Sequence, residues 1–204
     1  MTSLANRRSA ILLFSLPDCL HSHRTRLVIK EKEISAELHE IDINNISEEI
    51  KFISPYDDFP TLVDRDLILQ NSRVIIEYLD ERFPHPPLLP VDPVARAKFR
   101  LALDRIENEW YPEFNKSYNN GILDNSFQDK IKSYFLEIVP LINNNFFMST
   151  DFGLVDCSLA PLLWRIKCLG MEIKENKEII DAYSERIFNK ESFQASLSET
   201  EKDM

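Results

Sequence analysis

The feature that most constrains the fold of this chain is a run of prolines near its middle. Residues 84–93 read Pro-His-Pro-Pro-Leu-Leu-Pro-Val-Asp-Pro, so five of the ten positions are proline. Proline fixes φ and has no amide hydrogen to donate, which excludes such a run from helix interiors and central strands. We therefore expect an extended connector that divides the 204-residue chain into a first domain over 1–83, a linker over 84–92 and a second domain over 93–204.

The domain before the connector combines strand and helix periodicities. Residues 10–15 form a continuous apolar run, typical of a strand covered on both faces, and the apolar positions over 19–32 then recur at helical spacing. Two short apolar runs around Asp64-Arg65-Asp66 predict a hairpin. We expect, in chain order, a strand over 10–15, a helix over 19–32, a strand over 36–41, a weak helix over 47–53, strands over 61–63 and 67–69, and a helix that Asn71 or Ser72 caps.

The domain after the connector has helical periodicity throughout. Apolar side chains recur every three or four residues over 99–114, again over 131–142 and again over 155–166. This pattern predicts an all-α second domain, so the expected fold class is α/β followed by all-α. We expect the polar ends, residues 1–8 and 198–204, to be frayed.

The net charge narrows the class of partner. The formal net charge is -10 at pH 7, and it is divided evenly, because residues 1–89 carry 10 basic and 15 acidic side chains and the remainder carry 14 and 19. Contacts with phosphates need clustered lysine and arginine, which this distribution does not supply. We expect proteins or small molecules as partners and no direct contact with DNA or RNA.

The cysteines and histidines indicate neither disulfides nor a metal site. The three cysteines are widely spaced and contain no Cys-x-x-Cys pair, and the four histidines include no pair at metal-binding spacing. We expect no metal and no cofactor. This cysteine usage fits a reducing cytoplasm, and no apolar stretch approaches the roughly 20 residues of a membrane helix.

Two residues are candidates for nucleophilic chemistry. Cys19 stands at the expected start of a helix, where the positive end of the helix dipole can lower a thiol pKa, although a half-buried helix-start cysteine without a partner base is the commoner case. Ser15 ends the first expected strand, and serine in that place is more often a turn former. Both stay open as catalytic alternatives.

Three motifs stand out: Phe59-Pro60-Thr61-Leu62, Gln70-Asn71-Ser72, and Leu154 to Pro161. They resemble motifs of the glutathione transferase superfamily, which joins a thioredoxin-like domain to a helical domain. In Phe59-Pro60-Thr61-Leu62, the resemblance implies a cis peptide bond before Pro60 and a backbone that pairs with the glutathione cysteinyl group. In Gln70-Asn71-Ser72, it implies a helix start that binds a glutathione carboxylate. The third, Leu154 to Pro161, resembles the superfamily's helix-capping box, whose aspartate, here Asp156, reaches back to the cap backbone.

The departures from that superfamily weaken the case for catalysis. Its usual glutamate is Asn71 here, so an ionic contact to the glutamyl amino group becomes a neutral one. The proline that follows the cysteine in cysteine-type transferases is Leu20. The capping box opens with Gly153 in place of serine or threonine, which predicts a cap weaker by a few tenths of a kcal/mol up to about 1 kcal/mol. We expect glutathione binding at Pro60, Asn71 and Ser72 to be weak or absent.

Four stretches narrow the resemblance within the superfamily: Pro60 to Arg65, Glu77 to Leu88, Pro93 to Arg96, and Leu154 to Arg165. Through them the chain resembles the stringent starvation protein A family along nearly its whole length. The resemblance implies a homodimer that binds RNA polymerase holoenzyme, alters transcription under starvation and acid stress, and lacks ordinary transferase activity.

One further segment is a candidate for protein binding. A proline-rich linker is often only a spacer, but a stiff apolar strip with one titratable ring also loses little chain entropy on docking. With the family resemblance, we interpret this strip as the polymerase-binding site, with Arg65 nearby. The strip consists of Phe83, Pro84, His85, Pro86 and Pro87.

The sequence thus leaves two functions open. The favoured one is a non-enzymatic adaptor that acts on RNA polymerase through protein contacts. The alternative is a cysteine-type glutathione transferase or thiol reductase with Cys19 as the nucleophile and with Pro60 and Ser72 as binding elements.

Overall fold

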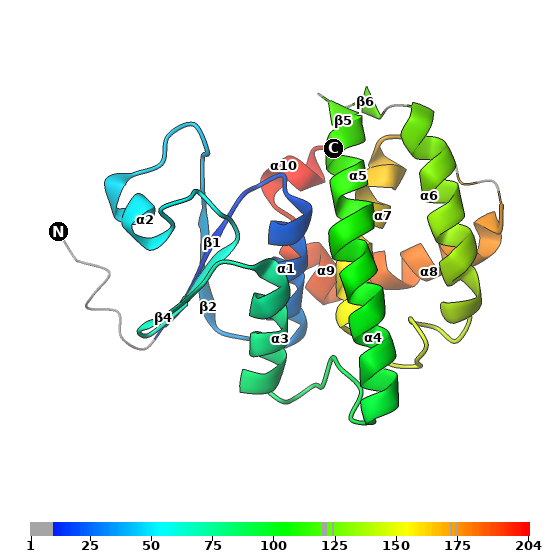
Figure 1. The fold of residues 1–204 in the computed structure, drawn as a ribbon, viewed down its shortest axis with the longest axis horizontal. Helices are drawn as coiled ribbons and strands as arrows, with labels where there is room; N and C mark the ends of the chain where they lie inside the picture. Colours follow the sequence, from blue (N-terminus) through cyan, green and yellow to red (C-terminus); the bar gives the residue numbers. More distant parts are fainter. Residues whose placement is uncertain (1–9, 120–121, 124, 172, 174) are drawn as a thin grey trace. The chain divides into compact units, whose positions relative to one another are not determined.

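The structure is a computed structural model that describes residues 10–119, 122–123, 125–171, 173 and 175–204. The chain divides into two compact units (Figure 1): unit 1 comprises Met1–Pro86 with Ala195–Asp203, and unit 2 comprises Pro87–Gln194 with Met204. No helix or strand lies between Arg82 and Pro93, as the proline run predicts. The expectation for residues 1–8 lies outside the described residues.

Unit 1 is built on a four-stranded sheet of β1 Ile11–Ser15, β2 Ala36–Glu40, β3 Thr61–Asp64 and β4 Leu67–Leu69, in the order β2-β1-β3-β4. Strand β1 pairs in parallel with β2 and antiparallel with β3, so that Leu13 lies opposite both Leu38 and Leu62. All five residues of β1 are buried, which is why its sequence is continuously apolar. The predicted thioredoxin-like order is confirmed: β1 Ile11–Ser15, α1 Leu20–Glu31, β2 Ala36–Glu40, α2 Glu48–Ile53, β3 Thr61–Asp64, β4 Leu67–Leu69 and α3 Ser72–Arg82.

The two faces of this sheet are covered by different helices. Helices α1 and α3 pack together on one face, and α2 lies on the other (Figure 1). Alternation along β1 sends Leu12 and Phe14 toward the α2 face, where they form a buried cluster with Ile41 and Phe59. Ile50 of α2 packs against that cluster. This apolar face explains why the short helix α2 forms.

Unit 2 is mostly helical. A continuous helical stretch begins at Pro93 with Asp92 as its cap, passes through a π-helical turn and ends at Ser117. A short ladder of two-residue strands interrupts the helices. The elements are α4 Pro93–Arg105, the π-turn η2 Ile106–Trp110, α5 Tyr111–Ser117, β5 Tyr118–Asn119, β6 Ile122–Leu123, α6 Asn125–Ile138, the 3₁₀ turn η3 Val139–Leu141, α7 Leu154–Cys168, α8 Lys177–Phe188 and α9 Glu191–Ser196, whose last two residues belong to unit 1. In the described part of the chain, no helix has the length and apolar character that a membrane crossing needs.

The start of α7 shows why Gly153 stands at its cap. A Cβ atom on Gly153 would lie 2.9 Å from the backbone oxygen of Leu88, which itself accepts a hydrogen bond from the Leu154 amide. Asp156 reaches back to the Gly153 amide at 2.8 Å, as the capping-box resemblance implies. The glycine is therefore required by a close approach of two backbones.

Asp156 is fully buried and accepts three hydrogen bonds, from the amides of Phe147 and Gly153 and from the Tyr183 hydroxyl at 2.6 Å. Burial raises the pKa of this carboxyl from 3.8 to about 6, against the opposing effect of these hydrogen bonds. A raised pKa means that the folded state holds a proton that the unfolded state releases between pH 4 and 6. This stabilisation is present below the unfolded pKa and is lost as the pH rises through the folded pKa.

We therefore expect the difference in unfolding free energy between the parent and Asp156→Asn to decrease as the pH rises from about 4 to about 6 and to level off above about 7. The change should be on the order of 3 kcal/mol, because each pH unit between two pKa values corresponds to about 1.4 kcal/mol. Urea unfolding of both proteins across this range measures it. A difference that stays constant from pH 4 to 8 would contradict the raised pKa.

Candidate functional site

Cys19 caps the N-terminus of α1 with an extended backbone. Its carbonyl accepts the first helical hydrogen bond, from the His23 amide at 2.8 Å, and its side chain is half-buried. The thiol therefore stands where the sequence placed it, beside the amino-terminal end of a helix of 12 residues. This arrangement permits thiol chemistry but supplies no general base by itself.

Ser15, the second catalytic candidate, is buried and already engaged. Its hydroxyl accepts a hydrogen bond from Arg26 Nη1 at 2.5 Å. The same nitrogen donates to the Leu16 carbonyl at 3.0 Å, so Arg26 fixes the turn that follows β1. A hydroxyl held in this way serves the fold, which agrees with its interpretation as a turn residue.

Arg26 belongs to a buried cluster that the sequence did not reveal. Its guanidinium donates to Glu201 Oε2 at 2.6 Å, and His23 Nδ1 lies 3.3 Å from the other oxygen of that carboxylate. Glu201 is fully buried and also accepts from the Ser198 amide in a capping box of α10, Glu199–Lys202. The expectation that residues 198–204 are frayed is therefore wrong over this helix, because a buried ion pair holds it to unit 1.

The expected glutathione-like pocket residues lie at the starts of β3 and α3. Pro60 is buried and follows a cis peptide bond, as the resemblance implies. Asn71 is the cap of α3, where its side-chain oxygen accepts hydrogen bonds from the amides of Arg73 at 2.9 Å and Val74 at 3.1 Å. The Asn71 oxygen is thus occupied by the helix it begins.

Ser72 is buried and contacts two side chains of α1 that the sequence analysis did not assign to the pocket. Its hydroxyl accepts a hydrogen bond from Arg24 Nη2 at 2.5 Å and lies 3.0 Å from His21 Nδ1. Arg24 is fully buried, and its guanidinium places a positive charge next to the Ser72 hydroxyl. Arginine on a helical face gives no sequence signal for such a role, because most arginines of that pattern are solvated.

We call residues Phe83, Pro84, His85, Pro86 and Pro87 the docking strip. Its last four residues are exposed, and Phe83 is half-buried. The Pro86 carbonyl accepts a hydrogen bond from Lys32 Nζ at 2.6 Å, and the same ammonium group pairs with Asp80 at 2.7 Å. Lys32 and Asp80 are both buried, so they hold the strip through its backbone. The rings of the exposed strip residues stay accessible to solvent.

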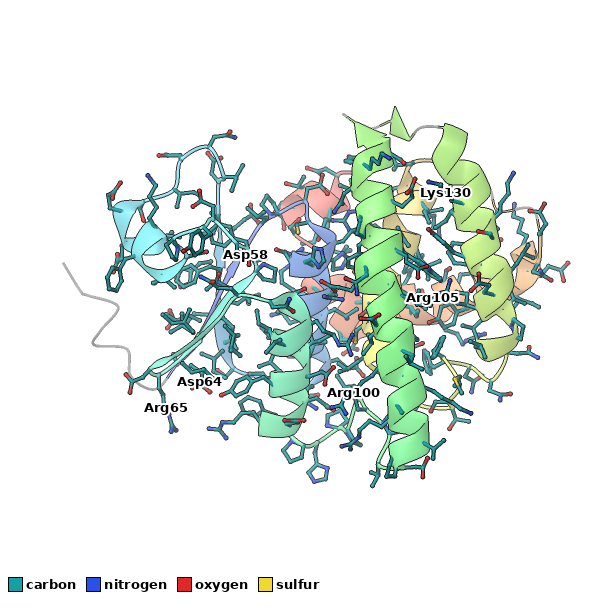
Figure 2. The ribbon with its side chains drawn as sticks, viewed as in Figure 1. Asp58, Asp64, Arg65, Arg100, Arg105 and Lys130 are labelled. Carbon is teal, nitrogen blue, oxygen red and sulfur yellow. The ribbon has the colours of Figure 1, made fainter. Side chains whose placement is uncertain are left out.

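Arg65 is exposed at the tip of the β3–β4 hairpin, with its backbone in the left-handed region at φ 58° (Figure 2). The preceding Asp64 accepts a hydrogen bond from the Tyr78 hydroxyl at 2.6 Å and lies 3.8 Å from Arg82 Nε. Burial first and Asp64 second raise the pKa of Tyr78, which keeps its phenol a donor. The base of the Arg65 hairpin is thereby tied to the end of α3, and Arg82 in turn stacks on the Phe83 ring.

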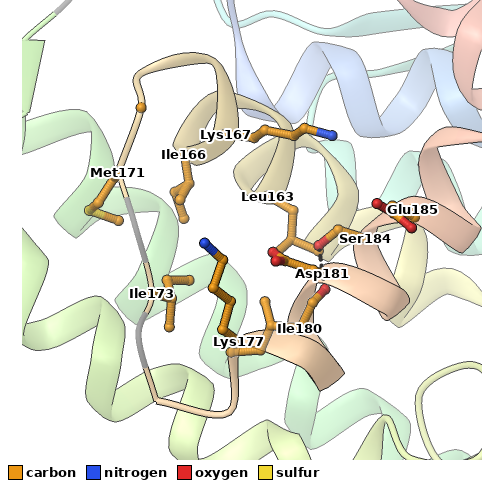
Figure 3. A pocket seen from close by; sticks show the side chains of 11 residues that line it. Leu163, Ile166, Lys167, Met171, Ile173, Lys177, Ile180, Asp181, Ser184 and Glu185 are labelled. Atoms are coloured by element: carbon orange, nitrogen blue, oxygen red, sulfur yellow. Dashed lines mark hydrogen bonds between the residues drawn. The ribbon is translucent and has the colours of Figure 1, made fainter.

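One hollow in unit 2 contains none of the candidate site residues. It has a volume of about 340 Å³ and lies between α7 and α8, with Lys177 and Asp181 among its lining residues (Figure 3). Over the described residues, no group of three histidine, cysteine or acidic side chains is placed to hold a metal ion.

Comparison with known proteins agrees with this geometry. Residues 13–87 match the glutathione S-transferase N-terminal domain. The chain is similar in structure to glutathione transferase Omega 3C of Trametes versicolor, with a TM-score of 0.83 at 21% identity over 96% of this chain and 88% of that one. Such a low identity supports the fold alone.

The sequence identity is much higher to a second group of proteins, the stringent starvation protein A homologs. The chain is 45% identical to the stringent starvation protein A homolog of Haemophilus influenzae, over 98% of this chain and 95% of the relative. It is 44% identical to the homolog of Coxiella burnetii, over 97% of this chain and 96% of the relative. The chain therefore belongs to the stringent starvation protein A family, within the glutathione transferase superfamily.

Proposed function

We propose that this protein binds RNA polymerase holoenzyme in the cytoplasm and alters transcription under starvation and acid stress through protein contacts. The observation that carries the proposal is the docking strip, which is exposed over Pro84–Pro87 and anchored through the Pro86 carbonyl to the buried pair of Lys32 and Asp80. An anchored strip loses little conformational entropy when a partner binds, so more of the contact energy appears as affinity. Family membership supports the same partner.

The occupied polar groups of the glutathione-like pocket also favour an adaptor over a transferase. Arg26 holds the Ser15 hydroxyl, Arg24 holds that of Ser72, and Asn71 caps α3. A ligand carboxylate would have to compete with these contacts or reorganise them. This competition adds to the loss of the superfamily's usual glutamate at position 71.

Affinity purification tests the proposal directly. The tagged protein is purified from the cells that produce it, during growth and after starvation, and the polymerase subunits that copurify are quantified. The purified protein is then mixed with purified holoenzyme to separate direct from bridged contact. The proposal requires polymerase to copurify in the first arm and to bind in the second, and absence from both would refute it.

The alternative, a transferase or thiol reductase using Cys19, is supported by the position of this half-exposed thiol at the start of α1. We expect this alternative to be wrong, so the turnover number for conjugating glutathione to an aromatic electrophile should stay well below the roughly 1 per second ordinary for enzymes. A turnover number of about 1 per second or more that disappears in Cys19→Ala would favour the transferase over the adaptor. Cys168→Ala is the matched control, because that thiol is also half-buried.

We also propose a homodimer with a two-fold interface along α3 and α4. On unit 1, a groove of about 470 Å³ with Leu67 and Val74 in its wall is exposed, and on unit 2 the Leu101 side chain of α4 is exposed. In a two-fold interface each such residue is buried in both copies, so one substitution acts twice.

We expect Val74→Asp combined with Leu101→Asp to convert the dimer into a 23.9 kDa monomer in sedimentation experiments at micromolar concentration. Val91→Asp is the control, since Val91 is more exposed than Val74 or Leu101 but lies in the connector. A parent protein that sediments as a monomer would contradict the proposed dimer.

A further inference from the structure

Helix α2 and the turn after it present the two most exposed aromatic side chains in the described part of the chain. Phe52 is 89% exposed and Tyr56 is 86% exposed. Ile50 and Ile53 of the same segment pack against the buried cluster of unit 1, so the fold of α2 is explained without either aromatic ring. Large rings left in water are uncommon in a folded unit and often mark a surface that another molecule covers.

The surroundings of these rings are strongly acidic. Residues 40–58 carry six acidic side chains and a single basic one, Lys51, whose ammonium lies 3.4 Å from Glu48. The other five carboxylates are exposed and can pair with a partner's cations. The six acidic residues are Glu40, Asp42, Glu48, Glu49, Asp57 and Asp58.

The turn that carries Tyr56 is held in place by short hydrogen bonds. Ser54 Oγ accepts from the Asp58 amide at 3.0 Å and donates to the Asp58 carbonyl at 3.2 Å, and Thr61 Oγ1 donates to that carbonyl at 2.6 Å. Asp57 adopts the left-handed conformation, φ 55°, between Tyr56 and Asp58. Asp58 lies just before β3 (Figure 2). The backbone that carries Tyr56, Asp57 and Asp58 is therefore fixed by contacts within unit 1.

We propose that residues 40–58 form a docking surface for an arginine-rich segment of a protein partner. The flat guanidinium group stacks on aromatic faces and pairs with carboxylates at the same time, which matches Phe52 and Tyr56 within their acidic surround. Lysine offers a point charge that pairs with the carboxylates but stacks less well. Nucleic acids are repelled by the same carboxylates. This surface is additional to the docking strip and independent of the polymerase contact.

Fluorescence anisotropy with labelled nona-arginine and nona-lysine tests the proposal on the purified full chain. The parent should bind nona-arginine more tightly than nona-lysine. Phe52→Ala with Tyr56→Ala leaves the net charge unchanged, and it should weaken nona-arginine binding by about five- to tenfold, as expected for two exposed cation–π contacts. Both rings are exposed, so the melting temperature should stay unchanged. Val91→Ala with Leu136→Ala, which trims two exposed side chains elsewhere, should have no effect.

A pair of matched charge variants separates a specific surface from general attraction to an acidic chain. Asp57→Asn with Asp58→Asn should weaken nona-arginine binding several-fold. Glu175→Gln with Glu178→Gln, which changes the net charge equally at exposed sites of unit 2, should change it less than about twofold. Equal weakening by both charge pairs, or no effect of removing the two rings, would overturn the proposal.

Discussion

Glu201→Ala is expected to lower the free energy of unfolding of unit 1 by about 3–5 kcal/mol, the cost typical of removing one partner of a buried ion pair. The substitution leaves the buried guanidinium of Arg26 without the carboxylate that lies 2.6 Å away, and it leaves His23 without the oxygen at 3.3 Å. It also removes the acceptor of the Ser198 amide in the capping box. Urea unfolding measured alongside hydrogen exchange of α1 and β1 checks the result.

Two controls make this prediction specific. Lys202→Ala removes an exposed side chain from the same short helix and should cost less than about 0.5 kcal/mol. Arg26→Met combined with Glu201→Leu removes both charges together and should recover much of the loss, because the desolvation of two ions is no longer required. If Glu201→Ala is as stable as Lys202→Ala, the carboxylate is not the group that holds the C-terminal segment.

The combined change Pro84→Ala, His85→Ala and Pro86→Ala is expected to abolish copurification of RNA polymerase and the stress-dependent change in transcription. The exposed rings contribute little to the core, so the melting temperature and the dimer should be retained. Loss of binding with an unchanged melting temperature would reflect the missing rings and the greater freedom of the chain.

The control changes two other exposed rings of unit 1, Phe52→Ala with Tyr56→Ala. This pair should retain polymerase. Arg65→Ala should weaken the interaction less than the triple change, since it removes one charge at the neighbouring hairpin. A triple variant that copurifies polymerase as well as the parent would show that the strip is a spacer and that the contact lies elsewhere.

Local pattern was sufficient for most of the fold. The apolar run ending at Ser15 is fully buried as β1, the charged turn at Arg65 separates β3 from β4, and Asn71 caps α3. Each of these signals acts over a few neighbouring residues, through side-chain alternation, turn conformation or capping. The proline run is also a local signal. Prolines lack the amide hydrogens that helix interiors and central strands require, and this does not depend on the rest of the fold.

The candidate site was only partly accessible to the same reasoning. Cys19, Pro60 and Ser72 could be located from motifs, but their contacts could not. Arg24, the fifth residue of α1, proved to be fully buried against Ser72, and no local feature separates it from a solvated arginine. The pairing of Lys32 with Asp80 under the docking strip likewise joins residues 48 positions apart.

What the sequence by itself determined is the set of elements, the break at the connector and the family, since all three depend on residue type and spacing along the chain. Only the tertiary structure showed that the C-terminal residues are packed against the first domain. The sequence places Glu201 in a polar tail, but the side chain lies fully buried against Arg26, 175 positions earlier. The physical reason is that a buried charge is stable only beside its partner, and that partner is brought to it by the fold and not by the chain.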